Sequence, residues 1–318
     1  MKLKEKIYVA GHTGLVGSAI VRLLKKRGFE NILTVSHSDL DLVRQDAVEV
    51  FFKEEKPDYV ILAAATVGGI RANSRFPADF IYDNLMISSN VIHAAYKFKA
   101  KRLLHLGSTC IYPKLALQPM PEDALLTGKL EPTNESYAIS KIAGIKLCES
   151  YNKQYGTDFR SVMPTNLYGP NDDFNSETSH VISGLMSRIH EAKVDNNPSV
   201  VVWGTGNVKR EFLYVDDMAE ASIFVLELDT HSYSKNTKPS LSHINIGSGI
   251  DLTIREMAKI ICKVVGYNGS LVFDESMPDG PPQKLIDVSR LSNMGWRYKT
   301  TLEQGLSYTY EWYKKEII

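Results

Sequence analysis

Tyr137 and Lys141 are ionisable side chains four residues apart, in a stretch whose pattern predicts a helix. A spacing of four places both on one helical face. An ammonium group beside a phenol favours the phenolate, so such a tyrosine can exchange protons near neutral pH. The same pair is also typical of a solvated helix surface. Two further features favour chemistry: a glycine-rich turn near the N-terminus, and Ser108 ahead of the tyrosine.

The glycine-rich turn follows a short apolar run at residues 6–10 and precedes a helical pattern that ends near Gly28. Strand, turn and helix are the context of a dinucleotide-binding fingerprint, in which glycines let the backbone approach a pyrophosphate at a helix N-terminus. The spacing is G-x-x-G-x-x-G. We expect the cofactor to contact Gly11, His12, Thr13, Gly14, Leu15, Val16 and Gly17.

Strands and helices alternate through the first half of the chain. The pattern predicts further strands at residues 32–35, 59–63, 102–106 and 159–163, and helices at 18–27, 47–53, 78–98 and from the segment of Tyr137 to about 155. This alternation predicts an α/β fold with a parallel, doubly wound sheet, which binds ligands at the carboxyl ends of its strands. Residues 213–215 and 244–246 are expected to return to the sheet.

The alternation weakens beyond Gly169 and Pro170. We therefore expect residues 1–166, with returning segments near 211–250, to form a dinucleotide-binding domain. Residues 167–210 and 251–318 should form a smaller, mixed C-terminal lobe that binds the substrate.

The composition excludes several classes of protein. The chain has 318 residues with 37 Lys and Arg against 37 Asp and Glu, so no charge excess points to nucleic acid or an anionic membrane. Three widely spaced cysteines argue against a disulfide framework or a metal site. The N-terminus lacks a signal-peptide pattern and no apolar run reaches membrane-spanning length, so we expect a soluble cytoplasmic protein.

Several motifs together resemble the extended short-chain dehydrogenase/reductase family, and most closely its members that act on nucleotide sugars. The resemblance covers nearly the whole chain and rests on residues 63–69, 106–113, 137–144, 164–170, 179–182, 202–206 and 210–217. It implies a Rossmann-type fold, NADP(H) as cofactor and a GDP-sugar as substrate. Cys110, two residues after Ser108, and His180 are its more specific signature.

The resemblance also implies roles for individual residues. The catalytic set is Ser108, Cys110, Tyr137, Lys141 and His180. The cofactor contacts beyond the glycine turn are His37, Ser38, Asp39, Leu40, Asp41, Leu42, Leu106, Gly107, Ser108, Thr109, Lys141, Pro164, Thr165, Asn166, Leu167 and His180. The substrate contacts are Arg188, Trp203, Arg210, Asp279 and Lys284.

The implied reaction is epimerisation of a 4-keto sugar at carbons 3 and 5, followed by reduction of the ketone. Ser108 and Tyr137 would stabilise the enolate oxygen, and Cys110 and His180 would exchange protons with the ring. Tyr137 would then protonate the alkoxide, while Lys141 would hold the ribose and lower the tyrosine pKa. Which of Cys110 and His180 serves which carbon stays open.

The cofactor site departs from the family pattern at two positions. Relatives that use NADPH often carry arginine inside the glycine turn and after the second strand, where this chain has Thr13 and His37. No acidic residue ends the second strand to hold a free 2′-hydroxyl, as an NAD site would prefer. We therefore expect NADP(H), with Ser36, His37 and Ser38 near the 2′-phosphate.

Other functions remain open on the sequence alone. One is another nucleotide-sugar enzyme of the family, a 4-epimerase, a reductase or a 4,6-dehydratase, although dehydratases typically place Asp-Glu where this chain has Thr109 and Cys110. A different class is a non-catalytic dinucleotide sensor, which the intact Ser108, Tyr137 and Lys141 disfavour. The helices near 84–98 and 137–155 resemble those through which relatives form homodimers.

Overall fold

The computed structural model describes residues 1–68, 70–175, 179–277 and 279–318. Its largest sheet has six strands in the order β2-β1-β3-β4-β5-β9, and every neighbouring pair is parallel. The strands are β1 (Ile7–Ala10), β2 (Ile32–Leu33), β3 (Tyr59–Leu62), β4 (Arg102–Leu106), β5 (Phe159–Pro164) and β9 (Ile244–Ile246). The expected α/β fold with a parallel, doubly wound sheet is confirmed.

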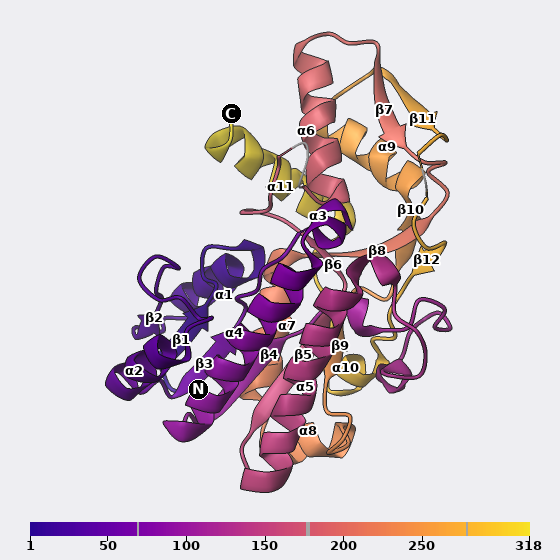
Figure 1. Ribbon diagram of the computed structural model, residues 1–318. Coiled ribbons are helices and arrows are strands. Elements are labelled where there is room, and N and C mark those ends of the chain that lie inside the picture. Colours follow the sequence, from indigo (N-terminus) through magenta and orange to yellow (C-terminus); the bar gives the residue numbers. More distant parts are fainter. Residues whose placement is uncertain (69, 176–178, 278) are drawn as a thin grey trace.

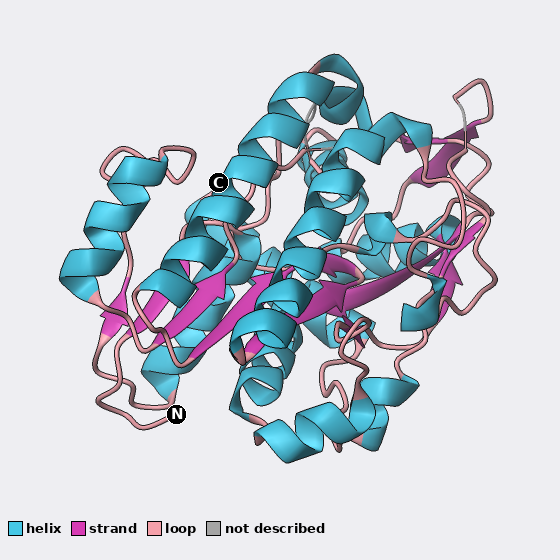
Figure 2. Ribbon diagram, turned by 60° about the horizontal axis from the view of Figure 1, so that its bottom comes forward, coloured by secondary structure: helices cyan, strands magenta, loops and turns pink. Residues whose placement is uncertain are grey.

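Helices cover both faces of this sheet (Figure 2). Alternate residues of β1 explain why both faces are apolar: Ile7 and Val9 belong to one buried cluster, Tyr8 and Ala10 to another. The first cluster includes helices α1 (Leu15–Lys26) and α7 (Val215–Glu227). The second includes α2 (Gln45–Glu55), α4 (Pro77–Lys97) and α5 (Glu135–Tyr155).

The other strands form two smaller sheets beyond the carboxyl edge of the large one (Figure 1). Strand β8 (Lys209–Tyr214) pairs with β6 (Asn166–Tyr168), β10 (Asp251–Thr253) and β12 (Gln283–Lys284). Strand β7 (Ser199–Trp203) pairs with β11 (Ser270–Asp274). Helices α6 (Val181–Val194), α9 (Ile254–Val265) and α11 (Leu302–Glu316) share a third buried cluster with them. The remaining helices are α3 (Ile70–Arg75), α8 (Thr230–Asn236) and α10 (Ser289–Asn293).

Two expectations about returning segments have different outcomes. Residues 244–246 join the large sheet as β9, as expected. The expectation for residues 213–215 is wrong, because Leu213 and Tyr214 lie in β8 of a smaller sheet and Val215 begins α7. The expected strand at 32–35 is also shorter, ending at Leu33. Gly69, the last residue of the motif at 63–69, lies outside the described residues.

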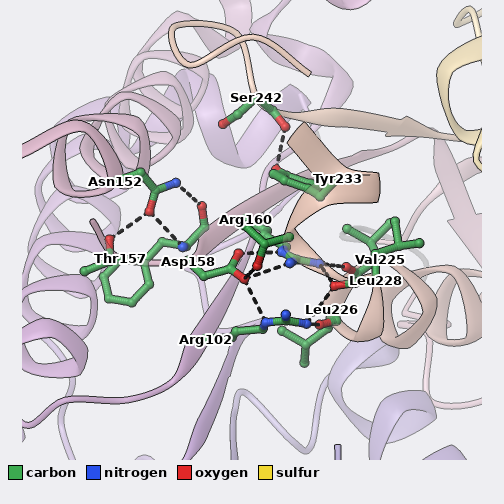
Figure 3. A network of polar contacts seen from close by, with 12 residues as sticks. Arg102, Asn152, Thr157, Asp158, Arg160, Val225, Leu226, Leu228, Tyr233 and Ser242 are labelled. Atoms are coloured by element: carbon green, nitrogen blue, oxygen red, sulfur yellow. Dashed lines mark hydrogen bonds and ion pairs between the residues drawn. The ribbon is translucent and has the colours of Figure 1, made fainter. Parts of the chain in front are cut away.

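A buried ion pair fastens α7 to the amino ends of β4 and β5 (Figure 3). The fully buried Arg160 makes two hydrogen bonds to Asp158, at 2.6 and 2.8 Å, and donates to the carbonyls of Val225 and Leu228. Arg102 also contacts Asp158, at 2.8 Å, and donates to the carbonyl of Leu228. Both guanidinium groups thus satisfy carbonyls at the C-terminus of α7 that the helix itself leaves free.

Within the described ranges, no helix has both the length and the apolar character needed to cross a membrane.

Candidate active site

The expected site segments follow the carboxyl ends of neighbouring parallel strands. Gly11 follows β1, Ala63 follows β3, Gly107 follows β4, and Pro164 ends β5. Because these strands are adjacent in the sheet order, the segments meet at one edge. The loop after β3 is held by Asn84 of α4, whose side chain accepts from the amide of Thr66 at 2.9 Å and donates to its carbonyl at 2.9 Å.

Two glycines of the glycine turn, Gly11 and Gly17, lie where no side chain would fit. Gly11 has φ +81°, and a Cβ there would lie 2.7 Å from the backbone of Ala64. A Cβ on Gly17 would lie 2.1 Å from the carbonyl oxygen of Gly11. Gly14 is the N-cap of α1 and brings no side chain to cap the first amides of the helix. These amides can therefore receive an anion such as a pyrophosphate.

The other expected cofactor contacts lie around this edge. His37, Ser38 and Asp39 are exposed after β2, where the Ser36 hydroxyl donates to Asp39 at 2.5 Å. Within the segment after β2, Leu40 and Leu42 are buried, and Asp41 accepts from the amide of Val43. Residues 106, 107 and 109 are buried at the end of β4, and residues 164–167 span the end of β5 and the start of β6.

Helix α5 carries Tyr137 and Lys141 to the end of β4. The Lys141 ammonium donates to the carbonyl of Leu106 at 2.9 Å and lies 5.7 Å from the centre of the Tyr137 ring. The ring also packs edge-on against Phe80 of α4. The expected shared helical face is therefore present. Lys141 is buried, so it reaches the edge of the sheet without contacting bulk water.

The expected lowering of the Tyr137 pKa is wrong for the protein alone. Burial raises the pKa of Tyr137, the neighbouring Cys110 raises it further, and a hydrogen bond with Ser108 only partly opposes the rise. Burial also lowers the pKa of Lys141 to about 8. Desolvation disfavours the charged forms of both side chains.

Ser108 and Cys110 lie in the turn that follows β4. Ser108 has an extended backbone and caps a 3₁₀ turn at Thr109–Ile111, accepting from the amide of Cys110 at 3.3 Å. Asn134, just before α5, donates from Nδ2 to the Cys110 sulfur at 3.2 Å. The turn after β4 thus places Ser108 and Cys110 beside Tyr137, which lies on α5.

His180 lies at the N-terminus of α6, the end of that helix nearer the large sheet (Figure 1). Its Nδ1 is 3.3 Å from a carboxyl oxygen of the buried Asp172, and its side chain is 54% exposed. The hydrogen bond to Asp172 raises the pKa of His180, against a smaller opposing effect of burial. A raised pKa suits a proton donor near neutral pH.

The five expected substrate contacts lie on the smaller sheets and beside them. The Arg188 guanidinium is 5.7 Å from the ring of Trp203, the last residue of β7. Arg210 of β8 is aligned with Lys284 of β12. Asp279 accepts from the backbone and hydroxyl of Thr205, at 3.1 and 2.7 Å.

Lys284 lines the same small recess as Cys110, so one of the expected substrate contacts lies beside the turn that carries Ser108 and Cys110.

Sequence reasoning missed two residues that contact members of the expected catalytic set. Asn134 precedes a helix, where asparagine is usually only an N-cap. Asp172 lies in a polar loop eight residues before His180. The only signal in the sequence is their residue type, a polar side chain near a family motif.

The chain has close relatives along its whole length. The model of the NAD dependent epimerase/dehydratase family matches residues 7–247. GDP-L-fucose synthase of Escherichia coli (strain K12) is 59% identical over 310 residues, which are 98% of this chain and 97% of that protein. GDP-L-fucose synthase 1 of Arabidopsis thaliana is 58% identical over 312 residues, with 98% and 94% covered.

Solved structures agree with this relationship. A GDP-6-OMe-4-keto-L-xylo-heptose reductase from C. jejuni superimposes with a TM-score of 0.94 at 41% identity, covering 99% of each chain. A GDP-L-fucose synthetase from Naegleria fowleri bound to NADP has a TM-score of 0.89 at 29% identity, covering 99% of this chain and 95% of that one. The chain therefore belongs to the NAD dependent epimerase/dehydratase family, as its full-length similarity to GDP-L-fucose synthases also indicates.

Proposed function

We propose that this protein catalyses the two reactions of a GDP-L-fucose synthase. It epimerises GDP-4-keto-6-deoxy-D-mannose at carbons 3 and 5 and then reduces the ketone at carbon 4 with NADPH. The observation that carries this function is the meeting of Ser108, Cys110, Tyr137 and Lys141 at one sheet edge. It occurs in a chain that is 52% to 59% identical to GDP-L-fucose synthases over nearly its full length.

NADP(H) is the cofactor, and the chain has the features that its binding requires. The crowded glycines and the uncapped start of α1 accept the pyrophosphate. The half-buried Ser36 and the exposed His37 and Ser38 supply hydroxyl and imidazole groups for the 2′-phosphate. When bound, NADPH supplies the hydride for the ketone. Lys141 holds the ribose hydroxyls with the donors that Leu106 leaves free.

The side chains of the site divide the work on the sugar. Ser108 and Tyr137 donate to the ketone oxygen and stabilise the enolate that forms when a proton leaves carbon 3 or 5. In each epimerisation a C–H bond breaks, its electron pair moves to the enolate, and a proton returns to the opposite face of that carbon. Cys110 and His180 exchange these protons. Tyr137 finally protonates the alkoxide oxygen.

Our proposals for the lobes and for the assembly rest on the same relationship. We propose that residues 1–166, with α7 and β9, bind the dinucleotide and that the smaller sheets bind the GDP-sugar through Arg188, Trp203, Arg210, Asp279 and Lys284. We also propose a homodimer formed through α4 and α5. Three large apolar side chains on these helices support it, because Tyr82, Ile139 and Tyr155 are 59%, 42% and 47% exposed.

The assembly has a direct test. Light scattering should give twice the mass of one chain, and a Tyr82→Glu, Ile139→Glu variant should give the mass of one chain. A wild-type monomer at micromolar concentration would reject the dimer.

The function is tested by incubating the protein with GDP-4-keto-6-deoxy-D-mannose in D₂O, once with NADPH and once with NADH. We expect faster oxidation of NADPH and a GDP-L-fucose product that carries deuterium at carbons 3 and 5. Folded protein that binds NADPH but oxidises neither cofactor would point to another nucleotide-sugar substrate.

Cys110→Ser provides the second arm of this test. Serine keeps a similar shape, but its hydroxyl is a far weaker acid than a thiol and is almost never ionised at neutral pH, so it can hardly serve as a base. Epimerisation should therefore slow more than hydride transfer. Reduced sugar that is not epimerised should then accumulate, as read from product stereochemistry. Formation of the normal product at the normal rate would remove Cys110 from the proton-exchanging role.

A further inference from the structure

Asn134 occupies the N-cap position of α5 but does not cap that helix. An asparagine at this position usually accepts a hydrogen bond from an amide in the first helical turn. Here the side chain makes no such bond and instead directs Nδ2 to the Cys110 sulfur, at 3.2 Å. The Asn134 side chain therefore contacts Cys110 and does not cap its own helix.

The other half of the same amide is buried and unsatisfied. The Asn134 Oδ1 atom has no hydrogen-bond partner among the described residues. Most buried polar atoms in proteins are paired, so an unpaired one calls for a functional or structural reason. The two ends of an amide have nearly the same shape, and a turn of the group exchanges its donor and acceptor ends.

An amide that can turn suits a sulfur that changes its protonation state. Towards a thiolate, the Nδ2 group donates a hydrogen bond, as in the present orientation. Towards a thiol, the Oδ1 atom of the turned amide accepts from S–H. The amide itself neither gains nor loses a proton in either arrangement.

We propose that Asn134 is a further residue of the epimerisation reaction, which supports the Cys110 sulfur both as thiolate and as thiol. The inference rests on the proposed function, because it takes Cys110 as a group that exchanges a proton with the sugar. When the sulfur removes a proton, C–H breaks, S–H forms and the electron pair moves to the enolate oxygen. When it returns a proton, the reverse changes occur.

The ionisable groups around Cys110 do not replace the contact between Asn134 and the Cys110 sulfur. Tyr137 faces it from α5, and Lys114, Glu131 and Lys284 line the same recess. Lys114 and Glu131 form an ion pair at 3.0 Å, so their charges largely offset each other. Asn134 is uncharged and lies within hydrogen-bond distance of the sulfur, so its effect is local and depends on which end of the amide faces Sγ.

The test replaces Asn134 with aspartate, which has almost the same shape but a carboxylate that only accepts hydrogen bonds. Asn134→Asp should favour the thiol and disfavour the thiolate. We expect alkylation of Cys110 by iodoacetamide to slow roughly tenfold at neutral pH and its midpoint to move to higher pH by about one unit. Peptide mass spectrometry separates Cys110 from Cys148 and Cys262. Uptake of deuterium from D₂O into the keto sugar without NADPH should fall in parallel.

Three further variants make the outcome specific. Thr133→Ala changes the exposed neighbour in the same turn and should leave both rates within twofold. Asn134→Ser keeps a good N-cap residue but cannot reach the sulfur, so it should slow alkylation even if the aspartate variant folds poorly. In a Cys110→Ser background, Asn134→Ser should cause no further loss of deuterium uptake, because the group it supports is gone.

The inference and the proposed function fail in different ways. Wild-type alkylation and deuterium uptake in a folded Asn134→Asp or Asn134→Ser variant would overturn the role of Asn134. A wild-type enzyme that takes up no deuterium into the keto sugar would overturn the proposed function. The alkylation profile would then still report whether Asn134 supports the Cys110 thiolate.

Discussion

Tyr137 lies where its environment opposes its ionisation, since burial raises its pKa and burial also lowers the pKa of Lys141. Such a tyrosine holds its proton firmly until a developing alkoxide approaches. In the protein without cofactor, Tyr137 is therefore protonated and suited to donate a proton, not to accept one. The spacing in the sequence correctly predicted the shared helical face. Spacing carries no information about burial, and burial decided the direction of the pKa shift.

Replacing Tyr137 with phenylalanine removes the phenolic oxygen and keeps the ring beside Phe80. We expect turnover to fall by roughly 10²–10⁴, the range for loss of a general acid. Steady-state NADPH oxidation measures the loss, and thermal unfolding should show an intact fold. Turnover near that of the wild type would exclude Tyr137 as the proton donor.

The pH dependence of cofactor binding should follow Lys141. Its ammonium is present below a pKa of about 8 and is lost as the pH rises through that value. If the ammonium holds the ribose, NADPH binding should weaken by roughly tenfold across this range, the scale of one hydrogen bond to a charged group. Titration calorimetry from pH 6.5 to about 9.5 measures it. The Lys141→Met variant should bind NADPH weakly, and its affinity should not change across this pH range. If the affinity of the variant still falls with rising pH, the pH dependence belongs to another group.

Helix α5 is positioned by a close approach to β4 at Gly144. A Cβ on Gly144 would lie 2.5 Å from the Nε2 atom of His105, a fully buried residue of β4. Burial, and to a lesser extent Lys141, lowers the pKa of His105 to about 3, so the ring stays neutral under the helix. The distance between α5 and β4 at Gly144 therefore determines where Tyr137 and Lys141 lie relative to the end of β4.

Gly144→Ala should therefore push α5 away from β4 and lengthen the hydrogen bond from the Lys141 ammonium to the carbonyl of Leu106. A displacement of about 1 Å at a reacting group can lower turnover by roughly 10²-fold. The double variant His105→Ala, Gly144→Ala makes room for the added methyl group and should recover part of the activity. Ser150→Ala on the exposed side of α5 is the control. Normal turnover in Gly144→Ala would show that the helix tolerates the shift.

At the scale of elements, the sequence predicted the large sheet well because its strands alternate with helices in order. It did not place residues 213–215, because β8 ends in four buried residues that resemble a strand of the large sheet. A short apolar run shows that a strand is buried but does not show which sheet contains it. The partners of β8 come from segments far apart in the chain, β6, β10 and β12. Asn134 and Asp172 escaped notice for a similar reason, since their partners are set by the tertiary fold.

The stability of the whole molecule should depend on the network around Arg160, at the edge of the sheet opposite the site. Arg160→Met removes the bidentate partner of Asp158, which keeps its ion pair with Arg102. Loss of one partner of a buried ion pair costs about 3–5 kcal/mol, and the remaining Arg102 should keep the loss at or below the lower end of that range. Urea unfolding measures the loss in free energy of unfolding, and turnover of the folded variant should change little.

Lys263→Ala is the matched control, because it removes an ion pair with Glu303 between side chains that are 70% and 51% exposed. Such exposed pairs contribute about 0–1 kcal/mol. Equal destabilisation by the two variants would contradict the importance of the buried network.

The position of β9 bears on how such a protein can be recombined. The chain completes five strands of the large sheet by Pro164, builds β6, β7 and β8 elsewhere, and returns to add β9 beside β5 before leaving again for β10. Consider a chimera with a relative that acts on another substrate, made by a single crossover near residue 165. It would take β9 and α7 from the donor, together with the donor's copy of the smaller sheets that we propose to bind the sugar. Exchange of specificity between such enzymes should therefore succeed only when the foreign β9 and α7 also fit the recipient's core.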